Sequence, residues 1–127
     1  MSKTILYDTD VLIDFLRGVS GAQEILADAE SSAIPACSAV TVGEIRAGMK
    51  KGEERATMQL FKGLLILPVD METALLAGEL KAQTTKQTLE LDDCLIAATA
   101  IRNAALLITR NAKHYPHPGL MLQPAIY

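Results

Sequence analysis

Acidic side chains stand in this sequence at places where a fold could bring them together. Asp8 follows the apolar stretch KTILY, Glu44 lies in TVGEIRAG, and Asp93 is the second acid of LDDCLIAATA. Asn111 follows another apolar stretch, LLIT. Two carboxylates about 4 Å apart repel by roughly 4 kcal/mol at an effective dielectric near 20, and a divalent cation removes that penalty. Because Mg²⁺ prefers oxygen ligands and often shares them with substrate phosphate, such a cluster predicts phosphoester chemistry.

Several of these residues also have a purely structural explanation. Asp8 or Asp10 could cap a helix that begins near Thr9, because Asp is a preferred N-cap residue. Thr41 and Glu44 have the T-x-x-E spacing of a capping box, in which Glu44 would satisfy a backbone N–H. Taken singly, these residues leave the structural and the chemical explanation open.

The adjacent pair Asp92 and Asp93 can be separated by helix geometry. Both would open a helix, where carboxylates favourably meet the positive end of the helix dipole. Neighbouring helical residues diverge by about 100°, so the two acids cannot share one face. Asp93 shares its stripe with the apolar Ile96 and Ala100, which we expect to face inward, whereas Asp92 lies on the side of Thr99, which we expect to face outward. Asp92 therefore suits a capping role, and an inward Asp93 requires a cationic partner.

Short apolar strands and helices alternate along the chain. We expect strands at residues 4–7, 33–37, 64–67, 105–109 and 120–123, and helices at 9–17, 20–30, 71–83 and 91–103, with two more between 38 and 65 broken near residues 51–52. Pro35 suggests that the second strand is frayed or near an edge. The alternation predicts an α/β fold with a mainly parallel sheet covered by helices on both faces. Ligands bind such sheets outside the carboxyl ends of the strands, where Asp8 and Asn111 fall.

Length and composition limit the classes of protein that fit. A chain of 127 residues suits a single domain over residues 1–127. No apolar run reaches the roughly 18 residues of a membrane helix, and the start lacks the features of a signal peptide, so we expect a cytoplasmic protein with no membrane contact. Cys37 and Cys94 follow no metal-ligand spacing and are expected to be buried reduced thiols.

Charge and histidine spacing give weaker signals. The net charge of −3 argues against a generic nucleic-acid coat. The basic run within residues 46–62 is more often a solvated helix face than a binding patch. His114 and His117 have H-x-x-H spacing in a Pro-rich loop, for which we expect a plain surface role.

Four segments of the chain resemble, in order, the signature blocks of the PIN domain, and specifically of the VapC-type toxins of bacterial toxin–antitoxin modules. These segments are YDTDVLID, TVGEIRAG, DDCLIAATAI and LLITRNAKHY. The resemblance covers nearly the whole chain. It implies a three-layer α/β/α sandwich and an Mg²⁺- or Mn²⁺-dependent ribonuclease.

The resemblance also implies roles for individual residues. Asp8 and Asp93 would bind the metal directly, Glu44 would act directly or through a water, and Thr9 would line the site. Asn111 falls at a fourth position that is commonly Asp, and this departure removes one negative charge. The residue at position 10, often Asn or Ser in relatives, is Asp10 here and could partly restore that charge.

The resemblance further implies what the site binds. Arg46 and Arg110 are the basic residues best placed to hold the RNA backbone. A homodimer and a cognate VapB-type antitoxin are expected, with the C-terminal segment of the antitoxin across the acidic groove. His114 belongs to the KHY end of the last block.

Two other functions compete with the ribonuclease hypothesis. Asp8-Thr9-Asp10 after a strand has the D-x-D form of haloacid-dehalogenase-like phosphatases, in which Asp8 would be a covalent nucleophile and Asp10 a general acid. The later acids open a helix instead of ending a strand, and no lysine has a clear phosphate-binding role, which disfavours this hypothesis. A non-catalytic PIN scaffold that only binds RNA or a partner is the second alternative, and Asn111 favours it.

Overall fold

The computed structural model describes residues 3–28 and 32–127, and its centre is a parallel β-sheet. In this part of the chain the sheet has five strands in the order β3-β2-β1-β4-β5, and every neighbouring pair is parallel. The strands are β1 (Lys3–Tyr7), β2 (Ala33–Ser38), β3 (Leu65–Leu67), β4 (Leu106–Thr109) and β5 (Met121–Pro124). The predicted α/β fold with a parallel sheet is therefore confirmed.

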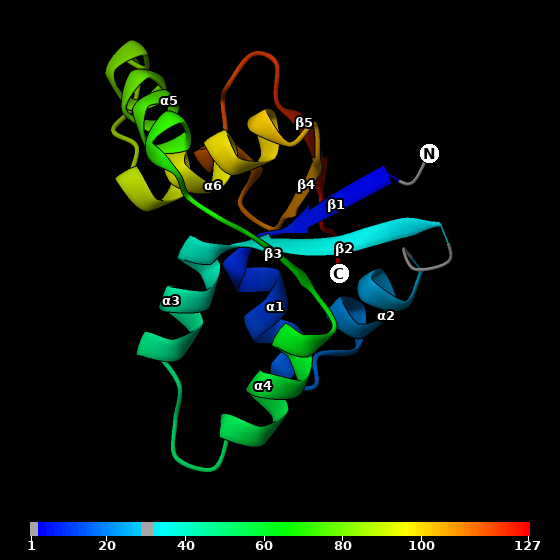
Figure 1. Ribbon diagram of the computed structural model, residues 1–127. Coiled ribbons are helices and arrows are strands. Elements are labelled where there is room, and N and C mark those ends of the chain that lie inside the picture. The colour runs from blue at the N-terminus through cyan, green and yellow to red at the C-terminus, as the bar shows by residue number, and fades with distance from the viewer. Residues whose placement is uncertain (1–2, 29–31) are drawn as a thin grey trace.

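Helices cover both faces of the sheet (Figure 1). Helices α5 and α6 lie on one side, and α1 to α4 lie on the other. Their bounds are α1 (Thr9–Leu16), α2 (Ser20–Asp28), α3 (Ala39–Ala47), α4 (Glu54–Lys62), α5 (Met71–Gln83) and α6 (Leu91–Arg102), with a short 3₁₀ helix η1 (Ala112–His114) after β4. The predicted end of the second helix at residue 30 lies outside the described residues. None of the helices described is both long and apolar enough to cross a bilayer.

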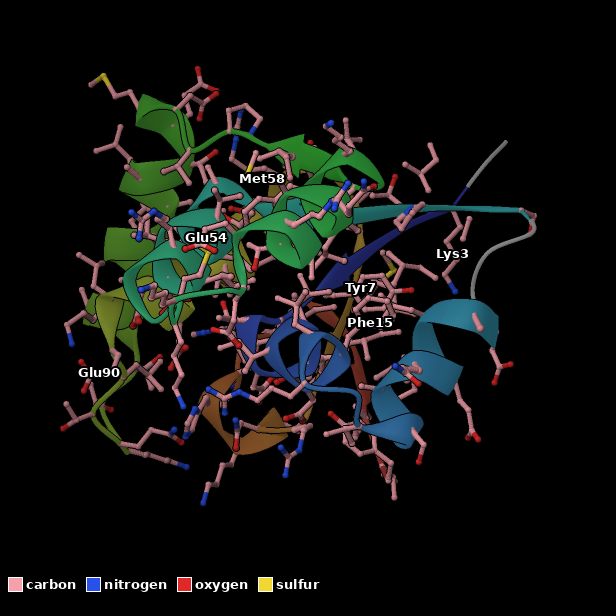
Figure 2. All side chains as sticks on the ribbon, turned by 90° about the horizontal axis from the view of Figure 1, so that it is seen from below. Lys3, Tyr7, Phe15, Glu54, Met58 and Glu90 are labelled. Carbon is pink, nitrogen blue, oxygen red and sulfur yellow. The ribbon has the colours of Figure 1, made fainter. Side chains whose placement is uncertain are left out.

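Alternation along the strands divides the buried side chains into two cores. Leu6 and Leu107 point toward α5 and α6, whereas Tyr7 and Ile108 pack with residues of α1. Figure 2 shows Tyr7 and Phe15 of α1, which belong to the core on the face of the sheet that α1 to α4 cover. Each such side chain, when fully buried, contributes about 1.5 to 3 kcal/mol to folding. The two cores hold β1 and β4 side by side, and the loops that leave these strands therefore start close together.

The strand order places the ends of β1 and β4 together. From β1 the chain proceeds to β2 and β3 on one side, while β4 and β5 lie on the other. The N–H of Asp8 donates to the carbonyl of Ile108 at 2.9 Å, so the β1–β4 pairing continues one residue beyond β1. This is the position at which open α/β sheets bind ligands, because the loops diverge there.

The prediction that the second strand is frayed or near an edge at Pro35 holds only locally, because β2 as a whole is an inner strand. β2 lies between β1 and β3. Pro35 is paired with Ile5 of β1, but β3 is so short that it pairs only with residues 36–38 of β2. Pro35 thus occupies the part of an inner strand that has one neighbour, where a missing N–H is tolerated.

Candidate active site

Side chains from separate segments line one cleft at the carboxyl ends of β1 and β4. The cleft has a volume of about 240 Å³. Its lining residues are Asp8, Thr9, Asp10, Ile13, Glu44, Asp93, Asn111 and His114. The acids expected to converge, at positions 8, 44 and 93, therefore face the same space, together with Thr9 and Asn111.

Asp8 both caps a helix and faces the cleft. Its Oδ1 accepts from the N–H of Thr9 at 2.8 Å, and its Oδ2 accepts from the Thr109 hydroxyl at 2.6 Å. Only 5% of Asp8 is exposed. A buried carboxylate with two fixed hydrogen bonds keeps one orientation, which a metal ligand requires. The structural and the chemical explanation of this residue are thus compatible.

Glu44 is held by threonines instead of by a capping box. The Thr9 hydroxyl donates to Glu44 Oε1 at 2.6 Å and lies 2.9 Å from the Thr41 hydroxyl. Because the single hydroxyl proton of Thr9 is used toward Glu44, the Thr41 hydroxyl donates to Thr9. The N-cap of α3 is Ser38, whose Oγ accepts from the N–H of Val40 at 3.2 Å. The capping-box alternative is therefore wrong, and Glu44 is free to face the cleft.

Asp93 lies between the cleft and the segment after β4. Its Oδ2 is 3.5 Å from His114 Nδ1, and its Oδ1 is 3.4 Å from the Tyr115 hydroxyl. His114 thus lines the cleft instead of having a plain surface role. His117 is only 7% exposed and lines a different hollow, so the two histidines do not form one site.

The expectation that Asp92 faces outward is wrong. Thr99 lies about two helical turns after Asp92, on the same face of α6. It is completely buried, and its hydroxyl lies 3.2 Å from Ser38 Oγ. This side of α6 therefore faces α3, the helix that carries Glu44. Asp92 Oδ1 also accepts from the N–H of Asp93 at 3.0 Å, as a residue at a helix start does. Helical periodicity identified two faces, but both are covered.

Burial and mutual repulsion raise the pKa of several acids. The pKa of Glu44 rises to about 7, first through burial and then through a hydrogen bond with Asp92. Burial raises the pKa of Asp10 to about 6, with the charge of Asp8 as the next cause. The pKa of Asp93 also rises to about 6, through burial and then through Asp92 and Asp8. Ionising these groups together is unfavourable, and a cation in the cleft would reverse that effect.

The donor set fits a hard divalent cation. Every carboxylate and amide that lines the cleft offers oxygen, which Mg²⁺ and Mn²⁺ prefer. Asp10 Oδ1 is buried and has no hydrogen-bond partner among the described residues. Within residues 3–28 and 32–127, no three acidic, histidine or cysteine side chains stand close enough to enclose an ion without moving. Asp8 and Glu44 each accept a hydrogen bond from a threonine hydroxyl.

Asp10 and Asn111, the two residues of the cleft at which the sequence departs from the usual PIN-domain pattern, are in contact with each other. Asn111 Nδ2 donates to Asp10 Oδ2. The Asn111 N–H donates to the Thr109 hydroxyl at 3.0 Å. Since the hydroxyl of Thr109 also donates to Asp8, one buried threonine contacts both Asp8 and Asn111. The amide oxygen of Asn111 remains as the group that could bind an ion or a water.

The two arginines expected at the site have different surroundings. Arg110 is half exposed, donates to Asp14 Oδ2 at 2.7 Å, and lies 5.4 Å from the centre of the Tyr127 ring. Its guanidinium is thus fixed beside the cleft. Arg46 is exposed in the last turn of α3 and does not line the cleft.

Sequence reasoning missed the residues that orient the acids. Thr109 and Thr41 are both fully buried, and Tyr115 is nearly so. A hydroxyl that ends an otherwise apolar strand, as in LLIT, is a signal that could have identified Thr109. Tyr115 offered no comparable signal, because its contact with Asp93 depends on the path of the loop after β4.

With this geometry established, comparison with known proteins decides the family. A profile of the PIN domain matches residues 5–118. The chain belongs to the PIN domain family. This confirms the resemblance drawn from the four sequence blocks, and the haloacid-dehalogenase alternative is therefore wrong.

Named relatives of this PIN domain include ribonucleases. The chain is 35% identical over 114 residues to Ribonuclease VapC10 of Mycobacterium tuberculosis, which covers 88% of this chain and 86% of that protein. A solved toxin–antitoxin complex from Klebsiella pneumoniae has 30% identity and a TM-score of 0.78, covering 91% and 94% of the two chains. VapBC2 from Rickettsia felis, solved with a promoter DNA fragment, has a TM-score of 0.83 over 95% and 98% of the chains; at 22% identity it supports the fold alone.

Proposed function

We propose that this PIN domain is a metal-dependent endoribonuclease that acts as the toxin of a VapBC-type toxin–antitoxin module. The observation that carries the proposal is that Asp8, Glu44 and Asp93, from three separate segments, line one cleft. The 35% identity to a ribonuclease of the same family supports the choice of RNA as substrate. Mg²⁺ or Mn²⁺ is the proposed cofactor, because the donors are all oxygen atoms.

The bound ion would neutralise charge on the phosphoryl oxygens and lower the pKa of a water. Asp8 and Asp93 are the proposed direct ligands. Asp8 is oriented by Thr109 and by the start of α1. Thr9 donates to Glu44 Oε1 and Asp92 shares a hydrogen bond with Glu44, so the carboxyl group of Glu44 is held where it lines the cleft. Thr9 and Thr109 thus act as positioning residues for the acids.

The remaining site residues bind or orient the RNA in this proposal. Asn111 completes the rim through its amide oxygen, while its Nδ2 holds Asp10. Arg110 is the better-placed phosphate ligand, because Asp14 uses only one of its guanidinium donors. Arg46 is exposed and would contact the backbone farther from the cleft.

A VapB-type antitoxin is the proposed partner, in a complex with a homodimer of this chain. The support is the toxin–antitoxin complex from Klebsiella pneumoniae, which matches 91% of the chain at 30% identity. An acidic cleft would also attract a cationic side chain of the partner by charge complementarity. Occupation of the cleft by such a side chain would compete with both the metal and RNA.

Cleavage of RNA by the purified protein tests the proposal. Wild type should cleave single-stranded RNA with Mg²⁺ or Mn²⁺ and arrest growth when expressed alone. Asp8→Ala and Asp93→Ala should abolish both effects, whereas Asp28→Ala, exposed at the end of α2, should retain them. A non-catalytic scaffold would instead bind RNA without cleaving it, and the Asp8 and Asp93 variants would keep nearly full RNA affinity.

A further inference from the structure

A second hollow lies beside the acidic cleft, and we call it the side hollow. It has a volume of about 430 Å³ and is bounded by residues 83–87, at the end of α5 and in the loop after it, and by Pro116, His117 and Pro118. Leu80, a buried residue of α5, also lines it. Its walls combine the apolar rings of Pro116 and Pro118 with the amides and hydroxyls of the 83–87 segment. This volume lies within the roughly 300 to 1,000 Å³ of small-molecule sites.

The side hollow and the acidic cleft are joined by one segment. Asn111 and His114 line the cleft, and Pro116 to Pro118, a few residues later, line the hollow. Gln87 Nε2 donates to the carbonyl of Lys113 at 2.9 Å and ties the two walls together. In Figure 2 the loop that leads into Glu90 lies on the same side as the orange segment that contains residues 111–118. A chain bound in the cleft would reach the hollow without crossing the molecule.

His117 is a polar side chain in the wall, and one of its two ring nitrogens has no hydrogen-bond partner among the described residues. Only 7% of the residue is exposed, and its Nε2 has no hydrogen-bond partner among the described residues. An unpaired buried polar atom is unfavourable, and native structures usually satisfy such atoms with a protein group, water or ligand. Burial also lowers the pKa of His117, so the ring is neutral at physiological pH. A neutral imidazole has one N–H donor and one acceptor nitrogen.

Two lysines stand next to the hollow. Lys86 lines it, and Lys113, whose carbonyl accepts from Gln87, lies in the sequence between residues that line the cleft and residues that line the hollow. Both are exposed, and neither forms an ion pair within the part of the chain that the structure describes. Lys81, in contrast, is engaged with the carbonyl of Leu89 and holds the end of the loop. Lysines without an ion-pair partner beside an acidic cleft are able to bind the RNA phosphates that flank the reacting phosphate.

We infer that the side hollow receives an unpaired nucleobase of the RNA, with Lys86 and Lys113 on the neighbouring phosphates. The inference rests on the proposed ribonuclease function and adds where RNA sequence is read. Single-stranded RNA is recognised by stacking splayed bases on aromatic rings and hydrogen-bonding their edges. Pro116 and Pro118, both exposed, provide the apolar faces, and His117, Gln83, Thr84 and Thr85 provide polar groups.

Mononucleotides test the hollow without metal or catalysis. The His117 ring and the amides of Thr84 and Thr85 are followed by NMR while each of the four nucleoside 5′-monophosphates is added to about 10 mM, a range suited to weak single-base binding. Resonance shifts with at least one nucleotide, and none with ribose 5-phosphate, are expected. No shifts, or equal shifts with ribose 5-phosphate, would overturn the nucleobase assignment. This result is independent of whether the protein cleaves RNA.

Cleavage of a random-sequence RNA pool tests the consequence for specificity. Wild type should show a base preference at one position near the cut. His117→Ala should weaken that preference and lower RNA affinity about 2- to 10-fold, the range for one lost hydrogen bond. Thr85→Ala, at an exposed residue, should also weaken the preference. It provides the test if His117→Ala, at a buried residue, fails to fold.

Lysine variants separate phosphate contact from general charge. Lys86→Ala should raise KM and leave kcat unchanged, while Lys62→Ala, exposed on α4, should change neither. An unchanged base preference in folded His117→Ala and in Thr85→Ala would refute the inference even when RNA is cut. Absence of any cutting by wild type would count against the proposed function alone, because the mononucleotide experiment still decides the hollow.

Discussion

Replacing Asp93 by asparagine should stabilise the metal-free protein at neutral pH and abolish RNA cleavage. Asp93 sits in the cleft with its pKa raised from 3.8 to about 6, first by burial and then by Asp92 and Asp8. Asparagine has nearly the same shape and can still accept from the Tyr115 hydroxyl through its oxygen. The substitution therefore removes the repelling charge with little change in packing.

The size and the pH range of this effect depend on the raised pKa. A rise of this size corresponds to about 3 kcal/mol for a fully buried group, and solvent screening in an open cleft reduces it to about 1 kcal/mol. A carboxyl whose folded-state pKa is raised binds its proton more tightly when folded. Its penalty is therefore absent below about pH 4 and grows until the pH exceeds about 6. In a chain of this size, 1 kcal/mol shifts Tm by about 3 to 5 °C.

Thermal unfolding in EDTA measures the effect. Asp93→Asn should melt about 3 to 5 °C above wild type near pH 8 and at the same temperature near pH 4. Asp28→Asn, exposed at the end of α2, should match wild type at both. With millimolar Mn²⁺ the order near pH 8 should reverse, because only wild type gains binding energy. A lower Tm for Asp93→Asn in EDTA near pH 8, or an equal gain at both pH values, would refute the repulsion argument.

Three further substitutions test separate parts of the structure. Asp70→Ala removes the side-chain cap of α5 and should lower the free energy of unfolding by about 1 kcal/mol in urea titrations, with cleavage unaffected. Thr109→Val removes the hydroxyl that binds both Asp8 and Asn111, so kcat should fall while RNA affinity, measured by fluorescence anisotropy, stays within about twofold. Asn111→Asp places a second carboxylate against Asp10; calorimetry should detect tighter Mn²⁺ binding, and Tm in EDTA should fall.

Much of the fold could be predicted because its local signals are strong. Asp70 caps α5 and the helix spans Met71–Gln83, as the sequence indicated. The compact strands and the break between α3 and α4 were also predictable from apolar runs and glycine. Asp8, directly after a strand, and Asp93, in the first turn of a helix, were identified for the same reason. Each of these features depends on residues close together in the sequence.

The contacts that orient the site could not be predicted in this way. Thr109 and Asp8 are separated by 101 positions, and so are Asn111 and Asp10. Asp92 was misassigned because a periodic pattern assumes one exposed helix face. The α6 helix is instead covered by α5 on one side and by α3 on another, and its residues 96–100 are all buried.

Anomalous diffraction from crystals soaked in Mn²⁺ tests the central claim most directly, because it locates the ion without relying on activity. We expect a peak in the cleft within about 2.0 to 2.3 Å of carboxylate oxygens of Asp8 and Asp93, with Glu44 bound directly or through one water. The same soak of Asp93→Asn crystals should give a weaker peak or none. A wild-type cleft that remains empty while Mn²⁺ binds elsewhere would contradict the proposal that these three acids form the metal site.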